Sequence, residues 1–319
     1  MILVTGATGF LGRHLVRRLL GAGEAVRCFV RPGSPGLEWL QSQPVEIAVG
    51  HLLDAASLGR ACDGVDHILH LAAPTREARD AVVEQTHRQG TALLAEAARA
   101  NRVDRLIMLS PLGSAASAGL LFLRSRGQAE EQLRQMGLPT VILQTSLMFG
   151  SGDRLISGTI RMLRRTGILL IPGTGKTMLQ PIWVGDVVSA LLRALRDDTV
   201  LGRTIPIGGP QHLTYEEIAD QVGKMLNVPR VKVHLSRRAV AWVSRLLEGL
   251  GLNPFLGYRH LELLEVGTIT ALDAVRRSFG FQPMPLIEGV AYHIVPRREM
   301  GASGPPSGVV RGSRSRERQ

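Results

Sequence analysis

Short apolar runs alternate along the first half of the chain with longer segments in which apolar residues recur at helical spacing. The short runs predict β-strands at Ile2–Thr5, Ala25–Val30, Val45–Ala48, His67–Leu71, Arg105–Leu109 and Thr140–Gln144. The periodic segments predict helices at Leu11–Leu20, Ala81–Ala100 and Phe122–Met136. Strands separated by helices lie parallel in one sheet with right-handed crossovers, so this order predicts a doubly wound α/β fold of the Rossmann type.

The pattern loosens after Gly150. A strand and a helix are expected within Gln180–Leu195, and a further strand at Thr204–Ile207. Thr214 and Glu217 have the spacing of a capping box at a helix start. We therefore expect a Rossmann domain at 1–210 and a small, mostly helical lobe at 211–296. Residues 297–319 are rich in Gly, Ser, Pro and Arg and are expected to form a basic tail without a fold.

Three glycines, Gly6, Gly9 and Gly12, follow the first predicted strand and lead into a predicted helix. Glycine lets the backbone approach a pyrophosphate closely, and the free N–H groups and the positive dipole end of the helix attract its charge. Glycines also serve ordinary tight turns, but here strand, triplet and helix coincide. The pattern predicts a dinucleotide site at this turn. Further contacts are expected from Thr8, Phe10 and Leu11.

The second predicted strand ends at Val30 and is followed by Arg31, where enzymes specific for NAD place an acidic residue. Arg31, with help from Arg27, has the charge to bind the 2′-phosphate of NADP(H) through charge-assisted hydrogen bonds. The plain alternative is a surface arginine in a chain rich in arginine. We expect NADP(H) to be favoured, with NAD(H) as the other candidate.

The formal net charge is +11, and the tail, with six Arg and two Glu, carries +4 of it. Part of the rest lies at Arg161, Arg164 and Arg165, where a solvated helix face is the plain explanation and affinity for an anionic membrane or an acidic partner is the alternative. We expect no nucleic-acid partner.

His67 and His70 fall on opposite faces of one strand, so we expect no metal site.

Several features bear on location. The chain starts directly with a predicted strand, and its two cysteines, Cys28 and Cys62, lack metal or redox spacing. No apolar run approaches the roughly 20 residues of a membrane helix. An apolar stripe at 240–250 with flanking arginines predicts an amphipathic helix that either packs on the Rossmann domain or docks on a membrane or partner. These features favour a cytoplasmic protein, with peripheral membrane contact left open.

A set of short motifs resembles the extended and atypical short-chain dehydrogenases/reductases, and among them the nucleotide-binding accessory subunit of respiratory complex I and its bacterial relatives. The motifs are TGATGFLG at 5–12, HLAAP at 70–74, GT at 90–91, LSPLGS at 109–114, FG at 149–150, GKTMLQPIWVGDV at 175–187 and GGPQHLTYEEIA at 208–219. The resemblance implies a bound NAD(P)(H). It also implies that Leu71, Ala72 and Ala73 line the cofactor.

Catalytic members of that family use a Ser and a Tyr-x-x-x-Lys pair, in which the tyrosine passes a proton to substrate and the lysine holds the ribose. By the resemblance, Ser110 matches the serine, Phe122 stands at the tyrosine position and Arg126 at the lysine position. Phe122 has no proton to give, whereas Arg126 can still hydrogen-bond the ribose. His87 is the strongest substitute donor by chemistry, although a polar helix residue is the plainer reading of it.

Two functions follow from this pattern. The first is an NAD(P)(H)-binding relative whose nucleotide serves assembly of, or sensing by, a respiratory or quinone-linked complex, as the resemblance implies. The second is a working NADPH-dependent reductase or epimerase with a replacement proton donor, which would depend on Ser110, His87 and Arg126. The usual Arg-Pro-Ser of the later loop is also altered, to Gln144-Thr145-Ser146. Several departures at one site favour binding over catalysis.

Overall fold

A computed structural model describes residues 1–73, 79–228, 230–236, 239, 242, 264 and 266–294. The expected tail at 297–319 and the stripe at 240–250, apart from Trp242, lie outside the described residues, as does Pro74 of the HLAAP motif. Among the described helices, none is both long and apolar enough to cross a bilayer.

A seven-stranded parallel sheet forms the main body, in the order β11-β6-β5-β4-β1-β2-β3. Its strands are β1 Ile2–Thr5, β2 Val26–Val30, β3 Glu46–Val49, β4 His67–His70, β5 Arg105–Pro111, β6 Thr140–Thr145 and β11 Thr204–Ile207. The chain starts near the middle and is wound outward in both directions, as the alternation of apolar runs predicts. The doubly wound α/β fold is therefore confirmed.

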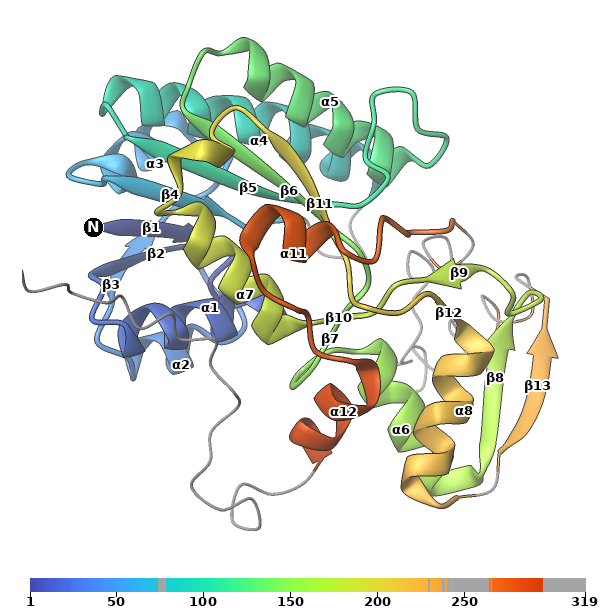
Figure 1. Cartoon of the computed structure of the whole chain (residues 1–319). Coiled ribbons are helices and arrows are strands. Elements are labelled where there is room, and N and C mark those ends of the chain that lie inside the picture. The colour runs from blue at the N-terminus through green and yellow to red at the C-terminus, as the bar shows by residue number, and fades with distance from the viewer. Residues whose placement is uncertain are drawn as a thin grey trace, which may run out of the picture.

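Helices cover both faces of this sheet (Figure 1). One face carries α3 Ala55–Cys62, α4 Asp80–Ala100 and α5 Leu121–Gln135, and the other carries α1 Phe10–Gly21, α2 Leu37–Gln41, α7 Val184–Ala194 and α11 Ala274–Phe279. A short 3-10 turn, η1, spans Asp198–Val200. Each face has its own aliphatic core, represented by Leu15 and Val187 on one side and by Leu94 and Leu133 on the other. The low aromatic content is compatible with this packing, because mostly aliphatic side chains fill the space between the sheet and the helices on its two faces.

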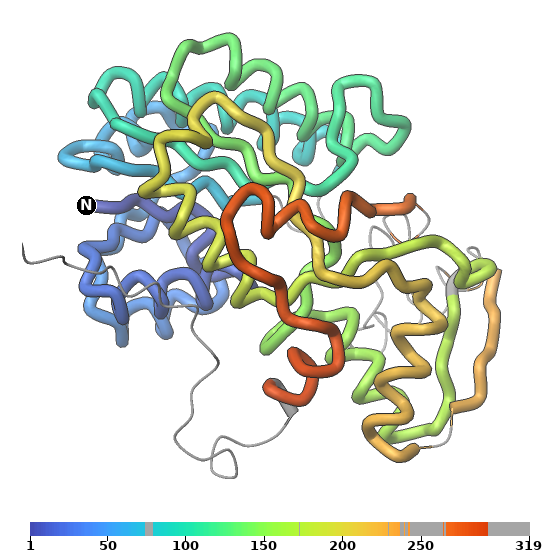
Figure 2. The backbone as a smooth tube through the Cα atoms, in the orientation of Figure 1, coloured from blue at the N-terminus to red at the C-terminus, as the bar shows by residue number. Residues whose placement is uncertain are grey.

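A smaller lobe has a third core. Its elements are β7 Met148–Phe149, α6 Leu155–Thr166, β8 Ile168–Pro172, β9 Met178–Leu179, β10 Ile182–Trp183, β12 Leu213–Thr214, α8 Tyr215–Leu226, β13 Val231–Leu235 and α12 Leu286–Ile294. Side chains from Phe149 to Leu179 pack there with others from Leu213 to Val290. The core of this lobe thus draws on both sides of position 210, and the backbone crosses repeatedly between the two parts (Figure 2).

The expected capping box is present at the start of α8. Glu217 N–H donates to Thr214 Oγ1 at 3.2 Å, and Thr214 N–H donates to the Glu217 carboxylate at 2.7 Å. This reciprocal pair satisfies two donors that a helix start would otherwise leave open, so local sequence alone fixes where α8 begins.

Gln180 ties the crossing segments together. Its side chain is fully buried, its Nε2 donates to Gly209 O at 2.7 Å, and its Oε1 accepts from Thr270 N at 2.7 Å. Its backbone carbonyl accepts from the Ser146 hydroxyl. A buried amide with both ends satisfied fixes the relative positions of three chain segments, which explains the Gln in the QPIWVGDV motif.

Asp186, at the start of α7, holds the segment that leads into α12. Its carboxylate is 7% exposed and accepts a hydrogen bond from Met284 N at 2.7 Å. Burial raises the pKa of Asp186 to about 6, against the opposing effect of that hydrogen bond. The folded protein therefore binds a proton at this carboxyl more tightly than the unfolded chain does.

The raised pKa of Asp186 predicts a pH-dependent gain from Asp186→Asn, whose amide oxygen still accepts from Met284. The parent loses stability between about pH 4 and pH 6, because in this range the unfolded chain has released this proton while the folded carboxyl still holds it, and the variant does not. Relative to the parent, the variant should gain up to about 3 kcal/mol above pH 6 and little at pH 4, measured by urea unfolding.

Asp197→Asn is the matched control. Asp197 accepts from Thr199 Oγ1 and N, and these bonds lower its pKa, so that variant should lose stability relative to the parent as pH rises. A difference between Asp186→Asn and the parent that stays constant with pH would show that Asp186 is ionised in the fold without penalty.

Candidate nucleotide-binding site

The turn between β1 and α1 has a conformation that only glycine provides. Gly6 has φ +77°, and a Cβ built there would lie 2.8 Å from Ala72 N at the end of β4. At Gly12 a Cβ would lie 2.2 Å from Gly6 O. At Gly9 the nearest atom is Gly6 O at 3.2 Å, so Gly9 is the least constrained by packing. The turn is thus pressed against the helix behind it and the strand beside it.

The start of α1 is open for an anion. Gly9 is the N-cap residue and supplies no side-chain cap, and the first turn has no acidic residue. Leu11 and Gly12 are buried, so only their backbone N–H groups are candidates for a ligand. Thr8 Oγ1 is hydrogen-bonded to Ser34 Oγ at 3.1 Å, which links the turn to the loop after β2. Uncapped N–H groups and a positive dipole end favour phosphate here.

A buried polar chain supports the turn from below. Thr5 Oγ1 is hydrogen-bonded to His70 Nδ1 at 2.8 Å and accepts from Ala72 N at 3.3 Å, while His70 Nε2 lies 3.3 Å from Thr91 Oγ1. Burial, assisted by the charge of Arg126, lowers the pKa of His70 to about 3, so the imidazole is neutral. Leu71 N–H donates to Thr5 O at 3.1 Å. These bonds fix the end of β4, including Leu71 and Ala72, across from Gly6.

Of the two arginines expected to bind the 2′-phosphate, Arg31 lies at the end of β2 and Arg27 does not. Arg31 is exposed just after the strand. Arg27 is instead bound to Glu46 at 2.8 Å and to Ala61 O at 3.0 Å, which places it toward the other end of β2. Arg13 was missed: its Nε donates to Thr8 O at 3.0 Å, and its guanidinium lies 5.6 Å from the Trp39 ring. Its position directly after Gly12 was the available signal.

Phe122, the residue expected at the tyrosine position, makes an aromatic contact from α5. The Phe122 ring meets the His87 ring edge to face, with centroids 5.1 Å apart. His87 is fully buried and its Nδ1 is hydrogen-bonded to Ser125 Oγ at 2.8 Å. Ser125 Oγ in turn donates to Phe122 O at 3.2 Å. The imidazole and hydroxyl that could replace the tyrosine are therefore engaged with each other beneath Phe122.

Arg126, the residue expected at the lysine position, is a buried cation. It is 3% exposed, and its Nη2 donates to Leu109 O at the end of β5. Its Nη1 is buried and has no hydrogen-bond partner among the described residues. Burial lowers the pKa of Arg126 to about 10, against the attraction of Glu130, so it stays charged at neutral pH. A buried donor without a partner fits a ligand hydroxyl such as that of a ribose.

Ser110 belongs to a buried cluster that the sequence did not reveal. Its Oγ donates to Ser114 Oγ at 3.1 Å, and Ser114 Oγ donates to Pro111 O at 2.7 Å. Glu130 is 1% exposed, accepts from Gln144 Nε2 at 2.9 Å, and has a pKa raised by burial. Glu130 lies one helical turn after Arg126, a spacing that could have indicated the pair.

No group of three metal-ligating side chains occurs in the described part of the chain.

Comparisons with known proteins agree with this geometry. Residues 2–118 match the NAD dependent epimerase/dehydratase family. The chain is 29% identical over 230 residues to the mitochondrial NADH dehydrogenase [ubiquinone] 1 alpha subcomplex subunit 9 of Arabidopsis thaliana, covering 70% of this chain and 57% of that relative. To the Rattus norvegicus subunit of the same name it is 26% identical, covering 89% of this chain and 76% of the subunit.

Two further likenesses extend over nearly the whole chain. Sterol demethylase protein B of Methylococcus capsulatus is 26% identical over 330 residues, covering 94% of this chain and 98% of that protein. The NADPH complex of the quinone oxidoreductase QOR2 from Escherichia coli has a TM-score of 0.72 at 20% identity, covering 92% of this chain and 99% of that one. At this identity the structural likeness concerns the fold alone.

The turn geometry predicts opposite outcomes for alanine at two glycines of α1. Gly12→Ala must displace Gly6 O or Ala7 and should cost about 2 kcal/mol or more. Gly21→Ala meets no atom within 4 Å and should be neutral or stabilise by up to about 1 kcal/mol through helix propensity. Denaturant unfolding of both variants measures this. Equal stabilities would mean that the turn and helix are not pressed together as described.

Proposed function

We propose that the protein binds NADP(H) at the β1–α1 turn and uses it for binding rather than for hydride transfer. The match of residues 2–118 to the NAD dependent epimerase/dehydratase family supports a nucleotide site at this turn. Gly6, Gly9 and Gly12 would let the pyrophosphate reach the open start of α1. NAD(H) is the weaker candidate, because Arg31 replaces the acidic residue that holds the ribose hydroxyls in NAD-specific sites.

The proposal rests on Phe122 and Arg126, which by the resemblance stand where the proton-transfer pair is expected. Phe122 lacks the hydroxyl that the reaction needs, and its ring contacts His87. Arg126 offers an unpartnered Nη1 suited to a ribose hydroxyl. A guanidinium with a pKa of about 10 remains a hydrogen-bond donor but does not release its proton near neutral pH. The nicotinamide would supply hydride chemistry when bound, but Phe122 and Arg126 would only help to bind the cofactor and would transfer no proton.

The tyrosines elsewhere support the same conclusion. Tyr215 is buried in the core of the smaller lobe, where its hydroxyl lies 3.0 Å from Thr159 Oγ1 and burial raises its pKa to about 12. Tyr292, on α12, contacts Trp183 on β10. Tyr258 lies outside the described residues. Neither described tyrosine is near α5, so neither replaces the missing donor at Phe122.

The biological role we propose is assembly of, or sensing within, a respiratory or quinone-linked complex. The support is the likeness to subunit 9 of the mitochondrial NADH dehydrogenase alpha subcomplex in Arabidopsis and rat. Such a role uses the nucleotide as a structural ligand whose binding stabilises the fold by mass action. Partner contact at the membrane would be peripheral.

Restoring the catalytic pair tests whether chemistry has been lost at this site. The parent should bind NADPH, followed by nicotinamide fluorescence, yet oxidise none of it with quinones, aldehydes or nucleotide sugars. The double variant Phe122→Tyr/Arg126→Lys should gain turnover, because it regains a phenol beside a cation that lowers the phenol pKa. Arg126→Lys alone is the control and should remain inactive.

Turnover by the parent that is abolished by Gly9→Asp would favour the other reading, a reductase or epimerase with a substitute donor. In that case the buried pair His87 and Ser125, together with Ser110, would be the residues to examine, because Ser125 links the imidazole to the tyrosine position.

A further inference from the structure

The outer end of the smaller lobe is formed by three chain segments. Helix α6 ends at Thr166, β8 begins at Ile168, and β13 begins at Val231. Val231 N–H donates to Gly167 O at 2.8 Å, which joins the three segments. Figures 1 and 2 show this end of the lobe pointing away from the seven-stranded sheet.

Three arginines lie on one side of α6 at this end. Arg161, Arg164 and Arg165 have the i, i+3, i+4 spacing of one helix face, and all three are exposed. None of them forms an ion pair with a described residue. Two of them sit in the last helical turn, where a positive charge is favourable to the dipole but leaves the cation free to meet an external anion.

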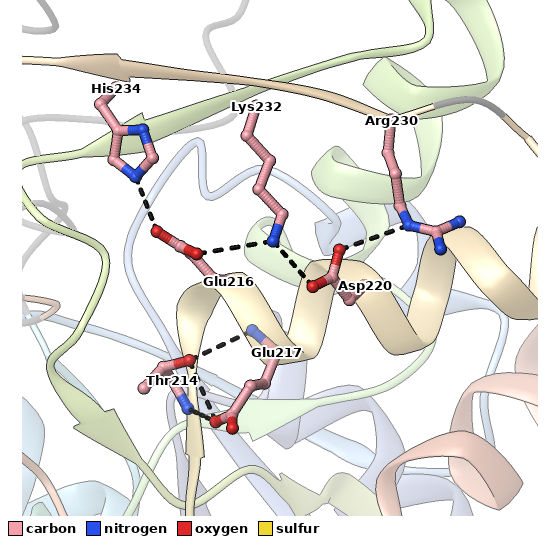
Figure 3. A network of polar contacts seen from close by, with 7 residues as sticks. All are labelled: Thr214, Glu216, Glu217, Asp220, Arg230, Lys232 and His234. Atoms are coloured by element: carbon pink, nitrogen blue, oxygen red, sulfur yellow. Dashed lines mark hydrogen bonds and ion pairs between the residues drawn. The ribbon is translucent and has the colours of Figure 1, made fainter.

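The neighbouring basic side chains on and just before β13 are different, because they contact acidic side chains of α8 (Figure 3). Lys232 Nζ lies 2.7 Å from the Asp220 carboxylate, and Arg230 Nε lies 3.3 Å from it. His234 Nε2 lies 2.6 Å from the Glu216 carboxylate. The acidic side chains of α8 therefore pair with the basic side chains of this segment. The three arginines of α6 have no ion-pair partner among the described residues.

Two aliphatic side chains are exposed beside the arginines. Ile168 is 40% exposed and Val231 is 60% exposed, and they are partners in the parallel register of β8 and β13. Paired β-branched residues on an open strand end would normally be covered. An exposed aliphatic pair next to three unpaired cations matches a bilayer interface, which offers anionic phosphates next to apolar carbon.

We propose that this end of the lobe, defined by Arg161, Arg164, Arg165, Ile168 and Val231, docks on the surface of an anionic lipid membrane. The arginines would contact lipid phosphates, and the two aliphatic side chains would enter the interface. This contact is peripheral and independent of nucleotide binding, so either property can fail without the other.

Co-sedimentation of the full chain with vesicles tests the proposal. Vesicles of phosphatidylcholine and phosphatidylglycerol, mixed at roughly 2:1, should bind the parent at about 0.1 M salt, and pure phosphatidylcholine should not. The triple variant Arg161→Gln/Arg164→Gln/Arg165→Gln should bind the anionic vesicles at least about 30-fold more weakly. Glutamine preserves helix propensity, so α6 should still form.

The matched control is Arg60→Gln/Arg99→Gln/Arg276→Gln, which removes the same charge from exposed positions on the Rossmann domain and leaves residues 297–319 intact. It should bind anionic vesicles nearly as well as the parent. Ile168→Thr/Val231→Thr, which keeps strand propensity, should weaken binding several-fold. Equal loss in both triple variants, or no binding of the parent, would overturn the proposal; the latter would leave an acidic protein surface as the fit for this patch.

Discussion

The close approach between the β1–α1 turn and its surroundings is the constraint on which the site depends. Gly6 faces the backbone at Ala72, and Gly12 faces the carbonyl of Gly6, at separations that exclude any Cβ. This packing brings the start of α1, the end of β4 and the loop after β2 to one edge of the sheet. The polar chain of Thr5, His70 and Thr91 then holds that edge without introducing charge.

Phe122 and Arg126, which the sequence motifs place at the expected tyrosine and lysine positions, both make buried contacts. The Phe122 ring contacts His87, and the Arg126 guanidinium is anchored on Leu109 O. Glu130 remains buried beside it, with Gln144 as its hydrogen-bond donor. The buried Glu130 carboxyl on the same helix helps to keep the Arg126 guanidinium charged, as the proposed contact with a ribose hydroxyl requires.

The sequence predicted the features set by local rules. Apolar runs located the central strands to within about two residues, glycine spacing located the turn, and Thr214 with Glu217 located the start of α8. It did not predict features set by distant contacts. Buried Glu130 on α5 accepts a hydrogen bond from Gln144 on β6, and Arg27 pairs with Glu46 on β3 instead of joining Arg31 at the end of β2. The smaller lobe likewise joins segments on both sides of position 210, which periodicity does not reveal.

Calorimetric titration of the unmodified protein with NADPH and NADH tests the central claim most directly. The account predicts saturable binding of one NADPH per chain and binding of NADH at least about tenfold weaker, because the 2′-phosphate adds charge-assisted hydrogen bonds at the Arg31 end of β2. Equal or tighter binding of NADH would contradict the role given to Arg31. Binding of neither nucleotide would contradict the site itself.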